Sequence, residues 1–270
     1  MSAHADLVAG KSSPSLVQGV PTDLIIKGVS KTYQVDADVI ESVRDISLSI
    51  GQGEFVSILG PSGCGKSTLL MMIAGLVAPT AGALLLDGNP ITRPRRQTSL
   101  LFQTPVLFPW RTVLSNVLFP VEVFKLDKEK YLIKALRLLK MAGLAEFQDR
   151  LPRHLSGGMV QRVPLCRALI TDPEVLLMDE PFSALDALNR DDMNVQLAKI
   201  WEEVRKTVVF VTHSIREAVF LSERVVVLSR RPATVMLDVR IDLPRPRTLE
   251  IQETPEFNSY CAQLRASLKH

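Results

Sequence analysis

The architecture of this chain follows from one short segment, Gly60-Pro61-Ser62-Gly63-Cys64-Gly65-Lys66-Ser67. The segment fits the phosphate-loop template G-x-x-x-x-G-K-[ST], which lies between a strand and a helix. Both flanking elements are predicted here, because an apolar run precedes it at 55–59 and a helix-forming run at 66–74 ends before Gly75. Its glycines let successive N–H groups point at phosphate oxygens, and the helix N-terminus adds partial positive charge. The segment therefore predicts a nucleotide-phosphate site, with a chance glycine-rich turn as the alternative.

A lysine, two hydroxyls and two acids are candidates for phosphate chemistry. Lys66 is expected to reach the β and γ phosphates, and Ser67 to coordinate Mg²⁺, with Thr68 beside it as a weaker candidate. Asp179 and Glu180 follow an apolar strand, at the edge where open parallel sheets bind their ligands. Asp179 would hold Mg²⁺, and Glu180 would orient and deprotonate the attacking water. Without the phosphate loop upstream, such an acidic pair is usually a solvated loop.

The order of predicted elements defines an α/β fold. Strands expected at 99–102, 175–178, 208–211 and 225–228 alternate with helices, which indicates a parallel sheet. Alternating apolar residues over 24–50 predict an antiparallel β subdomain, and those over 235–243 predict a half-exposed strand. An inserted α-helical subdomain is expected at about 104–165, with leucines near helical spacing at Leu132, Leu136, Leu139 and Leu144. We therefore expect a phosphate-loop (RecA-like) parallel-sheet core at 23–250, a flexible leader at 1–22 and a C-terminal extension at 251–270.

Composition excludes several other classes of protein. The 32 basic and 29 acidic side chains nearly balance, so nucleic acid is not expected as a partner. A bilayer-spanning helix needs about 20 consecutive apolar residues, and the longest apolar run, at 69–78, is about half that. The three cysteines, Cys64, Cys166 and Cys261, lack metal-type or paired spacing, which favours a reducing compartment. A cytosolic protein is the simplest interpretation.

A second motif gives a resemblance to a known family. Leu155-Ser156-Gly157-Gly158-Met159, with Gln161-Arg162, resembles the signature sequence of the ABC ATPases. Ser156 can cap a helix whose first amides are left open by Gly157 and Gly158, which makes a second anion site. The resemblance implies that ATP lies between the phosphate loop of one subunit and the signature of another. It also implies a dimer of ATPase subunits, beneath transmembrane permease subunits at the cytoplasmic face of the membrane.

Further positions match the same family one at a time. Tyr33 resembles the aromatic residue that stacks on adenine, although an ordinary strand tyrosine is the alternative. Gln103 resembles the glutamine that senses Mg²⁺ and the attacking water. His213 resembles the histidine that contacts the γ-phosphate. Ser214 with Glu217 forms a capping-box pattern that places His213 between a strand and a helix. Residues 183–186 resemble the loop that links the two active sites across the dimer.

Two positions carry expectations of their own. Pro164 falls inside the signature helix, where a proline removes a backbone donor and predicts a kink. Cys64 lies beside the phosphate loop's helix N-terminus, which predicts an unusually reactive thiol, whereas a small loop residue is the plain alternative.

Two short stretches resemble one branch of importer ATPases, the nitrate, sulfonate and taurine branch. They are Phe108-Pro109-Trp110-Arg111-Thr112-Val113 and Leu243-Pro244-Arg245-Pro246-Arg247. The branch implies a solute-binding protein in the full system. The competing interpretation is a soluble ABC ATPase acting on DNA or ribosomes, but the chain has one phosphate loop and a short insertion. A third, a regulatory protein that barely hydrolyses, predicts loss of Glu180 or His213, and both residues are present.

Overall fold

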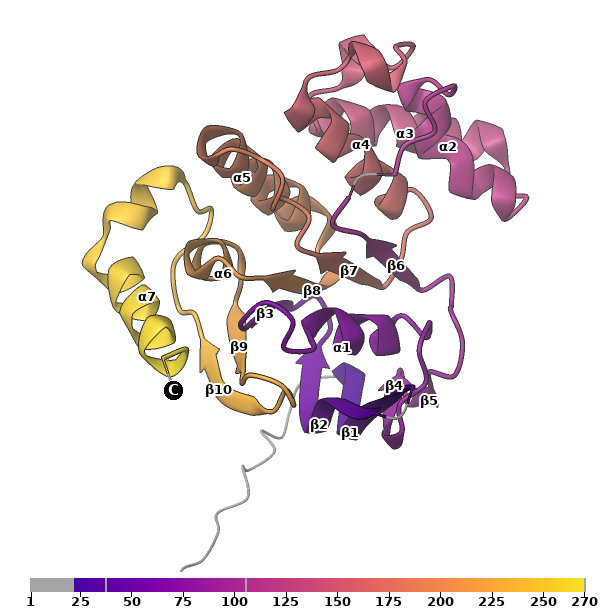
Figure 1. Cartoon of the computed structure of the whole chain (residues 1–270). Coiled ribbons are helices and arrows are strands. Elements are labelled where there is room, and N and C mark those ends of the chain that lie inside the picture. Colours follow the sequence, from indigo (N-terminus) through magenta and orange to yellow (C-terminus); the bar gives the residue numbers. More distant parts are fainter. Residues whose placement is uncertain (1–21, 37, 105, 270) are drawn as a thin grey trace, which may run out of the picture.

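A parallel sheet forms the centre of the computed structural model, which describes residues 22–36, 38–104 and 106–269. Its strands are β3 (Phe55–Leu59), β6 (Thr98–Leu101), β7 (Val175–Asp179), β8 (Thr207–Thr212), β9 (Arg224–Leu228) and β10 (Val235–Arg240). They lie in the order β10-β9-β3-β8-β7-β6, and each pair is parallel except β10 with β9 (Figure 1). The parallel sheet predicted from the alternation of strands and helices is confirmed.

Both faces of this sheet are covered. In β3, Phe55 and Leu59 point into a core shared with α5 (Ala187–Val204) and α6 (Ile215–Leu221). Val56 and Ile58 point to the opposite face, against α1 (Lys66–Ile73). Because alternate side chains leave a strand on opposite faces, a strand buried on both faces is apolar throughout. This explains why β3 appears in the sequence as an unbroken apolar run.

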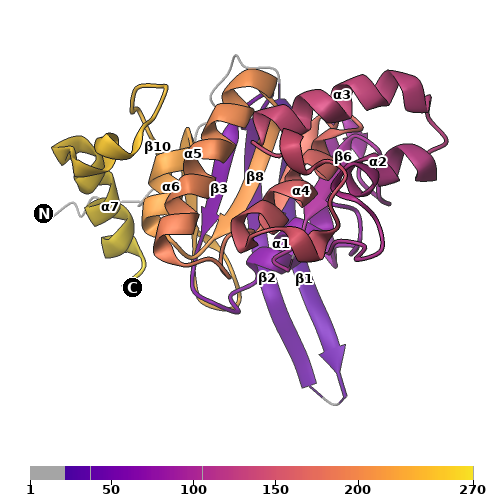
Figure 2. The ribbon, with the colours of Figure 1, turned by 90° about the horizontal axis from the view of Figure 1, so that it is seen from above.

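A second, antiparallel sheet lies beyond α1. It is made by β1 (Thr22–Val35), β2 (Asp38–Gly51), β4 (Ala81–Leu86) and β5 (Asn89–Pro90), in the order β2-β1-β4-β5. Ile46, Leu48 and Ile50 are buried as their alternation predicted, in the core that contains α1. The β1–β2 hairpin projects from the body of the molecule (Figure 2). The predicted leader lies outside the described residues except for Thr22, which already belongs to β1.

A helical subdomain follows β6. It contains α2 (Val113–Val123), α3 (Lys128–Met141) and the start of α4 (Gly157–Leu169), with 3₁₀ turns at Ala145–Phe147 and Pro152–His154. Helix α3 is present where leucines at helical spacing indicated helix, and Leu132 and Leu136 are 38% and 41% exposed. The buried face is centred on Ala135 and Leu138, so these two leucines fall at its edge. In α4 the helix continues through Pro164, and the predicted kink stays a prediction.

The C-terminal extension is an ordered element. After β10, which ends three residues before the predicted Leu243, come a 3₁₀ turn at Leu249–Glu253 and α7 (Pro255–Ser267). Helix α7 packs on α6 and buries Phe257 (Figure 1). Arg247 is also buried, and its guanidinium donates to the carbonyls of Val219, Phe220 and Ser222 at the end of α6. Among the described residues, no helix combines the length and apolar character that crossing a membrane requires.

Candidate functional site

The phosphate loop curls around the amine of Lys66, the first residue of α1. Lys66 Nζ donates to the carbonyls of Gly60 and Pro61, both at 2.9 Å, and the side chain is 4% exposed. Gly65 has φ +127°, and a Cβ there would lie 2.7 Å from the carbonyl oxygen of Ser42. Only glycine satisfies both constraints without strain. The loop therefore holds a buried positive charge at the N-terminus of a helix, as a polyphosphate site requires.

Two residues outside the motif support this loop. Ser42, at the base of the β1–β2 hairpin, donates from its hydroxyl to Thr68 Oγ1 over 3.1 Å. Arg231, in the turn between β9 and β10, donates through Nη2 to the carbonyl of Gly63 over 2.8 Å. Sequence reasoning missed both, because their separation from the loop along the chain leaves no local pattern. Cys64 is 2% exposed, so the expectation of a reactive thiol was wrong: the side chain packs into the core under the loop.

The structure brings together the two residues predicted to hold Mg²⁺ most directly. Ser67 Oγ donates to Asp179 Oδ1 over 3.1 Å, where α1 begins and β7 ends. Burial raises the pKa of Asp179, and the Ser67 hydrogen bond opposes that rise. A hydroxyl and a carboxylate oxygen side by side are the hard donors that Mg²⁺ prefers. The donor set therefore fits the ion.

Glu180 lies between two other predicted site residues. Its Oε2 is 2.8 Å from Nδ1 of His213, and its Oε1 is 3.7 Å from Nζ of Lys66. The backbone of Glu180 has φ +43°, which is uncommon for a residue with a side chain, and its N–H donates to the carbonyl of Val211. Adjacent strands β7 and β8 thus deliver an acid and a histidine to the same edge of the sheet.

Two further predicted residues lie around this edge. Gln103 follows β6, and its Nε2 donates to Ser183 Oγ over 3.1 Å. Tyr33 pairs across the hairpin with Ile40, two residues before Ser42, and the Lys31 amine lies 5.0 Å from its ring centre. The structure therefore places Gln103 beside the loop that follows Glu180. It places Tyr33 on the hairpin whose Ser42 supports the phosphate loop.

The signature residues lie elsewhere in the same chain. Ser156 caps α4 by accepting from the N–H of Met159 over 3.4 Å, as its sequence predicted. A Cβ at Gly157 would meet nothing within 4 Å, so this helix end is open. Figure 1 separates α4 from α1, with β7 between them. The two helix N-termini predicted to bind anions, those of α1 and α4, therefore lie in different parts of the chain.

His213 is positioned by a network that sequence reasoning described incompletely. The Ser214 hydroxyl accepts from the N–H of Glu217, as a capping box requires. The Glu217 carboxylate does not return to the Ser214 N–H, which was the other half of the prediction. It accepts from Thr212 Oγ1 over 2.5 Å instead, and that hydroxyl accepts from the Ser214 N–H. Burial raises the pKa of Glu217.

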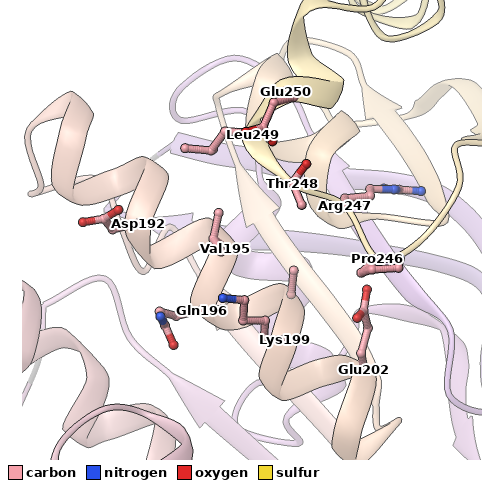
Figure 3. A pocket seen from close by; sticks show the side chains of 11 residues that line it. Asp192, Val195, Gln196, Lys199, Glu202, Pro246, Arg247, Thr248, Leu249 and Glu250 are labelled. Atoms are coloured by element: carbon pink, nitrogen blue, oxygen red, sulfur yellow. The ribbon is translucent and has the colours of Figure 1, made fainter.

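A separate hollow lies beside α5. It runs between α5 and residues 246–250 of the C-terminal segment, and Val195, Lys199, Glu202 and Leu249 line it (Figure 3). None of its lining residues is among those predicted for nucleotide or metal. The hollow therefore does not belong to the site at the sheet edge.

Comparison with known proteins decides the family. The family model described as ABC transporter matches residues 43–183, more than half of the chain. The chain belongs to the ABC transporter family. This ABC transporter chain is 42% identical over 244 residues to the taurine import ATP-binding protein of Roseobacter denitrificans, covering 87% of this chain and 90% of that one. It is 41% identical over 239 residues to the aliphatic sulfonates import ATP-binding protein of Bacillus cereus, covering 88% and 94%. It is 41% identical over 252 residues to the nitrate import ATP-binding protein of Synechocystis, covering 91% and 95%.

Solved structures agree with this assignment. The dimeric structure of a bacterial ABC transporter cassette matches with a TM-score of 0.70 and 37% identity, over 82% of this chain and 100% of that one. A dimeric post-hydrolysis state of the same cassette, bound to ADP and Pi, matches with a TM-score of 0.69 and 35% identity. The ABC transporter chain therefore has the phosphate-loop ATPase fold and is an ATPase of this family.

Proposed function

We propose that this chain is the ATP-hydrolysing subunit of an importer for taurine, another sulfonate, nitrate or a related small solute. The observation that carries the proposal is the Lys66–Glu180–His213 cluster beside the Ser67–Asp179 pair, at the carboxyl edge of the parallel sheet. The cargo class rests on the three relatives whose names give their solute. The subunit itself supplies energy rather than a solute site.

Each residue has a distinct role in this proposal. Residues 60–65 cradle the phosphates with backbone N–H groups, and Lys66 moves its amine from the loop carbonyls to the β and γ oxygens. Glu180 orients the attacking water and accepts its proton, while His213 contacts the γ-phosphate and keeps the Glu180 carboxylate directed. Tyr33 stacks on adenine, a contact worth about 1–3 kcal/mol per base in nucleic-acid complexes.

Ser67, Asp179 and Gln103 would hold Mg²⁺. When bound, the ion neutralises charge on the phosphate oxygens that develops during transfer. Asp179 is held ready for this role by the Ser67 hydroxyl, although burial disfavours its charged form. A nearby cation favours the ionised form of a carboxylate. Mg²⁺ that arrives with the nucleotide would therefore offset the effect of burial on Asp179.

A second copy of the chain completes the site in this proposal. Ser156, Gly157 and Gly158 of that copy offer the N-terminus of α4 to the γ-phosphate, so a homodimer encloses ATP. The solved relative is a dimer in both of its structures. The proposed assembly also contains transmembrane permease subunits, with the ATPase dimer bound peripherally at the cytoplasmic face, and a solute-binding protein. Nucleic acid has no role in it.

ATP hydrolysis tests the site. Lys66→Ala should abolish turnover or ATP binding, because it removes the only charge buried within the loop. Glu180→Gln should bind ATP normally and hydrolyse it at least about 100-fold more slowly, as expected when the general base is lost. Steady-state hydrolysis of purified full-length chain, with an ATP-binding titration, measures both. Normal turnover by either variant would remove that residue from the mechanism.

Purification from the native membrane tests the cargo. The tagged chain should bring down integral membrane proteins, which mass spectrometry identifies. ATPase activity of that complex should rise when a solute-binding protein loaded with taurine, an alkanesulfonate or nitrate is added. Recovery with ribosomes or nucleic acid, and without membrane proteins, would contradict an importer and favour the soluble alternative.

A further inference from the structure

Arg190, near the start of α5, holds the loop that follows Glu180. Its Nη2 donates to the carbonyl of Leu185 over 2.8 Å, and its Nε donates to the carbonyl of Phe182 over 3.4 Å. The guanidinium therefore holds the backbone of residues 182–185 at two carbonyls. This loop contains Ser183, whose hydroxyl accepts from Gln103. Arg190 thus acts on the segment that connects Glu180 to α5.

Glu217, in the first turn of α6, holds the backbone on both sides of His213. Its carboxylate accepts from the Thr212 hydroxyl, and that hydroxyl accepts from the Ser214 N–H over 2.9 Å. The His213 ring is half exposed, and Glu180 is the one side chain it contacts by a hydrogen bond in the described part of the chain. The direction of the ring therefore depends on its backbone, which Glu217 fixes.

The two anchors meet each other. Arg190 Nε lies 3.5 Å from Glu217 Oε1, and the Glu217 side chain is 9% exposed. Arg190 is the one cationic side chain within ion-pair distance of Glu217 among the residues described. Removing one partner of a buried pair leaves the other charge uncompensated, so neither residue can be changed without disturbing its counterpart. A continuous polar chain thus runs from the Leu185 carbonyl through Arg190, Glu217 and Thr212 to the peptide of His213.

We infer that Arg190 and Glu217 are a pair of positioning residues that set the geometry between Glu180 and His213 and couple the 182–185 loop to the histidine. This inference rests on the proposed roles of Glu180 and His213 in hydrolysis. Neither Arg190 nor Glu217 touches nucleotide in it. A shift of the 182–185 loop would move Arg190, which is bound to its carbonyls. Arg190 would move Glu217, and Glu217 would move Thr212 and so the backbone at His213.

The position of His213 is the direct test. We would label the full-length chain selectively at histidine and assign the His213 ring signal by its loss in His213→Gln. Arg190→Ala and Glu217→Gln should each shift that signal. Arg137→Ala and Glu203→Gln are matched controls, because they break an exposed ion pair between α3 and α5, whose atoms are 3.9 Å apart. These controls should leave the His213 signal unshifted. An unmoved His213 signal in Arg190→Ala and Glu217→Gln overturns the inference.

Kinetics supply the second test. Both variants should lower kcat by about 10- to 100-fold, since small misplacements of catalytic groups have effects of that size. KM for ATP should change by less than about two-fold, because the phosphate loop is untouched. The double variant should be no slower than the slower single variant, as expected for residues that act as a unit. Effects on kcat that multiply, or that stay within about two-fold of the controls, would contradict coupling.

Folding and function are kept apart by design. Thermal melting shows that each variant is folded at the assay temperature, and Arg190→Lys, which keeps the charge but loses the fork of donors, should give an intermediate kcat. If Arg190→Ala does not fold, the His213 signal and kcat are compared in Arg190→Lys and Glu217→Gln instead. The His213 signal requires no nucleotide or partner. A wild-type chain without ATPase activity therefore contradicts the proposed function alone, and the signal still decides the pair.

Discussion

Glu180 combines an uncommon backbone with two charged neighbours. Its φ of +43° costs about 1–3 kcal/mol in a residue with a side chain, and such strain persists only where the surroundings over-determine it. The Val211 carbonyl, Lys66 and His213 supply those surroundings. The strained turn points the carboxylate along the sheet edge instead of continuing β7. Because the backbone turns at Glu180, the two adjacent acids face different partners: Asp179 faces Ser67, and Glu180 faces His213.

The three cysteines give a test of burial at the residue scale. Cys64, Cys166 and Cys261 are all less than 6% exposed, and burial raises the pKa of Cys166 to about 12. We expect the native chain to react with a maleimide at none of them on the timescale in which the denatured chain reacts at all three. Thiol counting with and without denaturant measures this. Rapid labelling of Cys64 in the native chain would show that the phosphate loop opens.

Glu217 gives a test that depends on pH. Because burial raises its pKa in the folded chain, the folded state keeps a proton at pH values where the unfolded state has lost it. The contribution of Glu217 to the free energy of unfolding therefore falls as pH rises from the unfolded pKa through the raised folded pKa. Glu217→Gln lacks this titration. In urea unfolding, the stability of wild type relative to the variant should decrease as the pH rises above 4.5, the ordinary pKa of a glutamate, and an increase would contradict the raised pKa.

At the scale of elements, the junction between β3 and α1 is the most constrained part of the site. Gly65→Ala should lower the free energy of unfolding by about 1–3 kcal/mol, because a positive φ and the Ser42 carbonyl both exclude a Cβ. It should also weaken ATP binding. Gly157→Ala is the control, since its Cβ meets open space, and it should change stability by less than about 0.5 kcal/mol. Equal effects of the two substitutions on urea unfolding would contradict the constraint at the junction.

The elements that could be predicted from sequence are those with a local signal. Strand β3 was expected at its observed residues, because a doubly buried strand is a short apolar run between polar turns. A helix was expected around α3, but its spacing of leucines does not show which of them are buried: Leu132 and Leu136 lie at the edge of the buried face and Leu139 within it. Arg190 had no signal at all: its partners are carbonyls and a carboxylate from α6, and a sequence pattern does not record which backbone groups a guanidinium will reach.

At the scale of the whole molecule, the two proposed anion sites of one chain lie on separate helices. The phosphate loop opens at the N-terminus of α1, and Ser156 caps α4 in the helical subdomain. A single triphosphate held by both would therefore join two chains. In the proposed dimer, hydrolysis would release the γ-phosphate that holds each signature helix. The dimer should therefore live longest when the proposed general base, Glu180, is missing.

Dimer formation by Glu180→Gln tests this arrangement. With ATP and Mg²⁺ the variant should elute as a dimer in size-exclusion chromatography with light scattering, and as a monomer without nucleotide. Adding Gly157→Asp should keep it monomeric, because a carboxylate at the start of α4 repels the triphosphate of the other chain while favouring the helix itself. Adding Gly157→Ala instead should preserve the dimer. If Glu180→Gln with Gly157→Asp still forms a nucleotide-dependent dimer, the two chains are joined by some surface other than the signature helix.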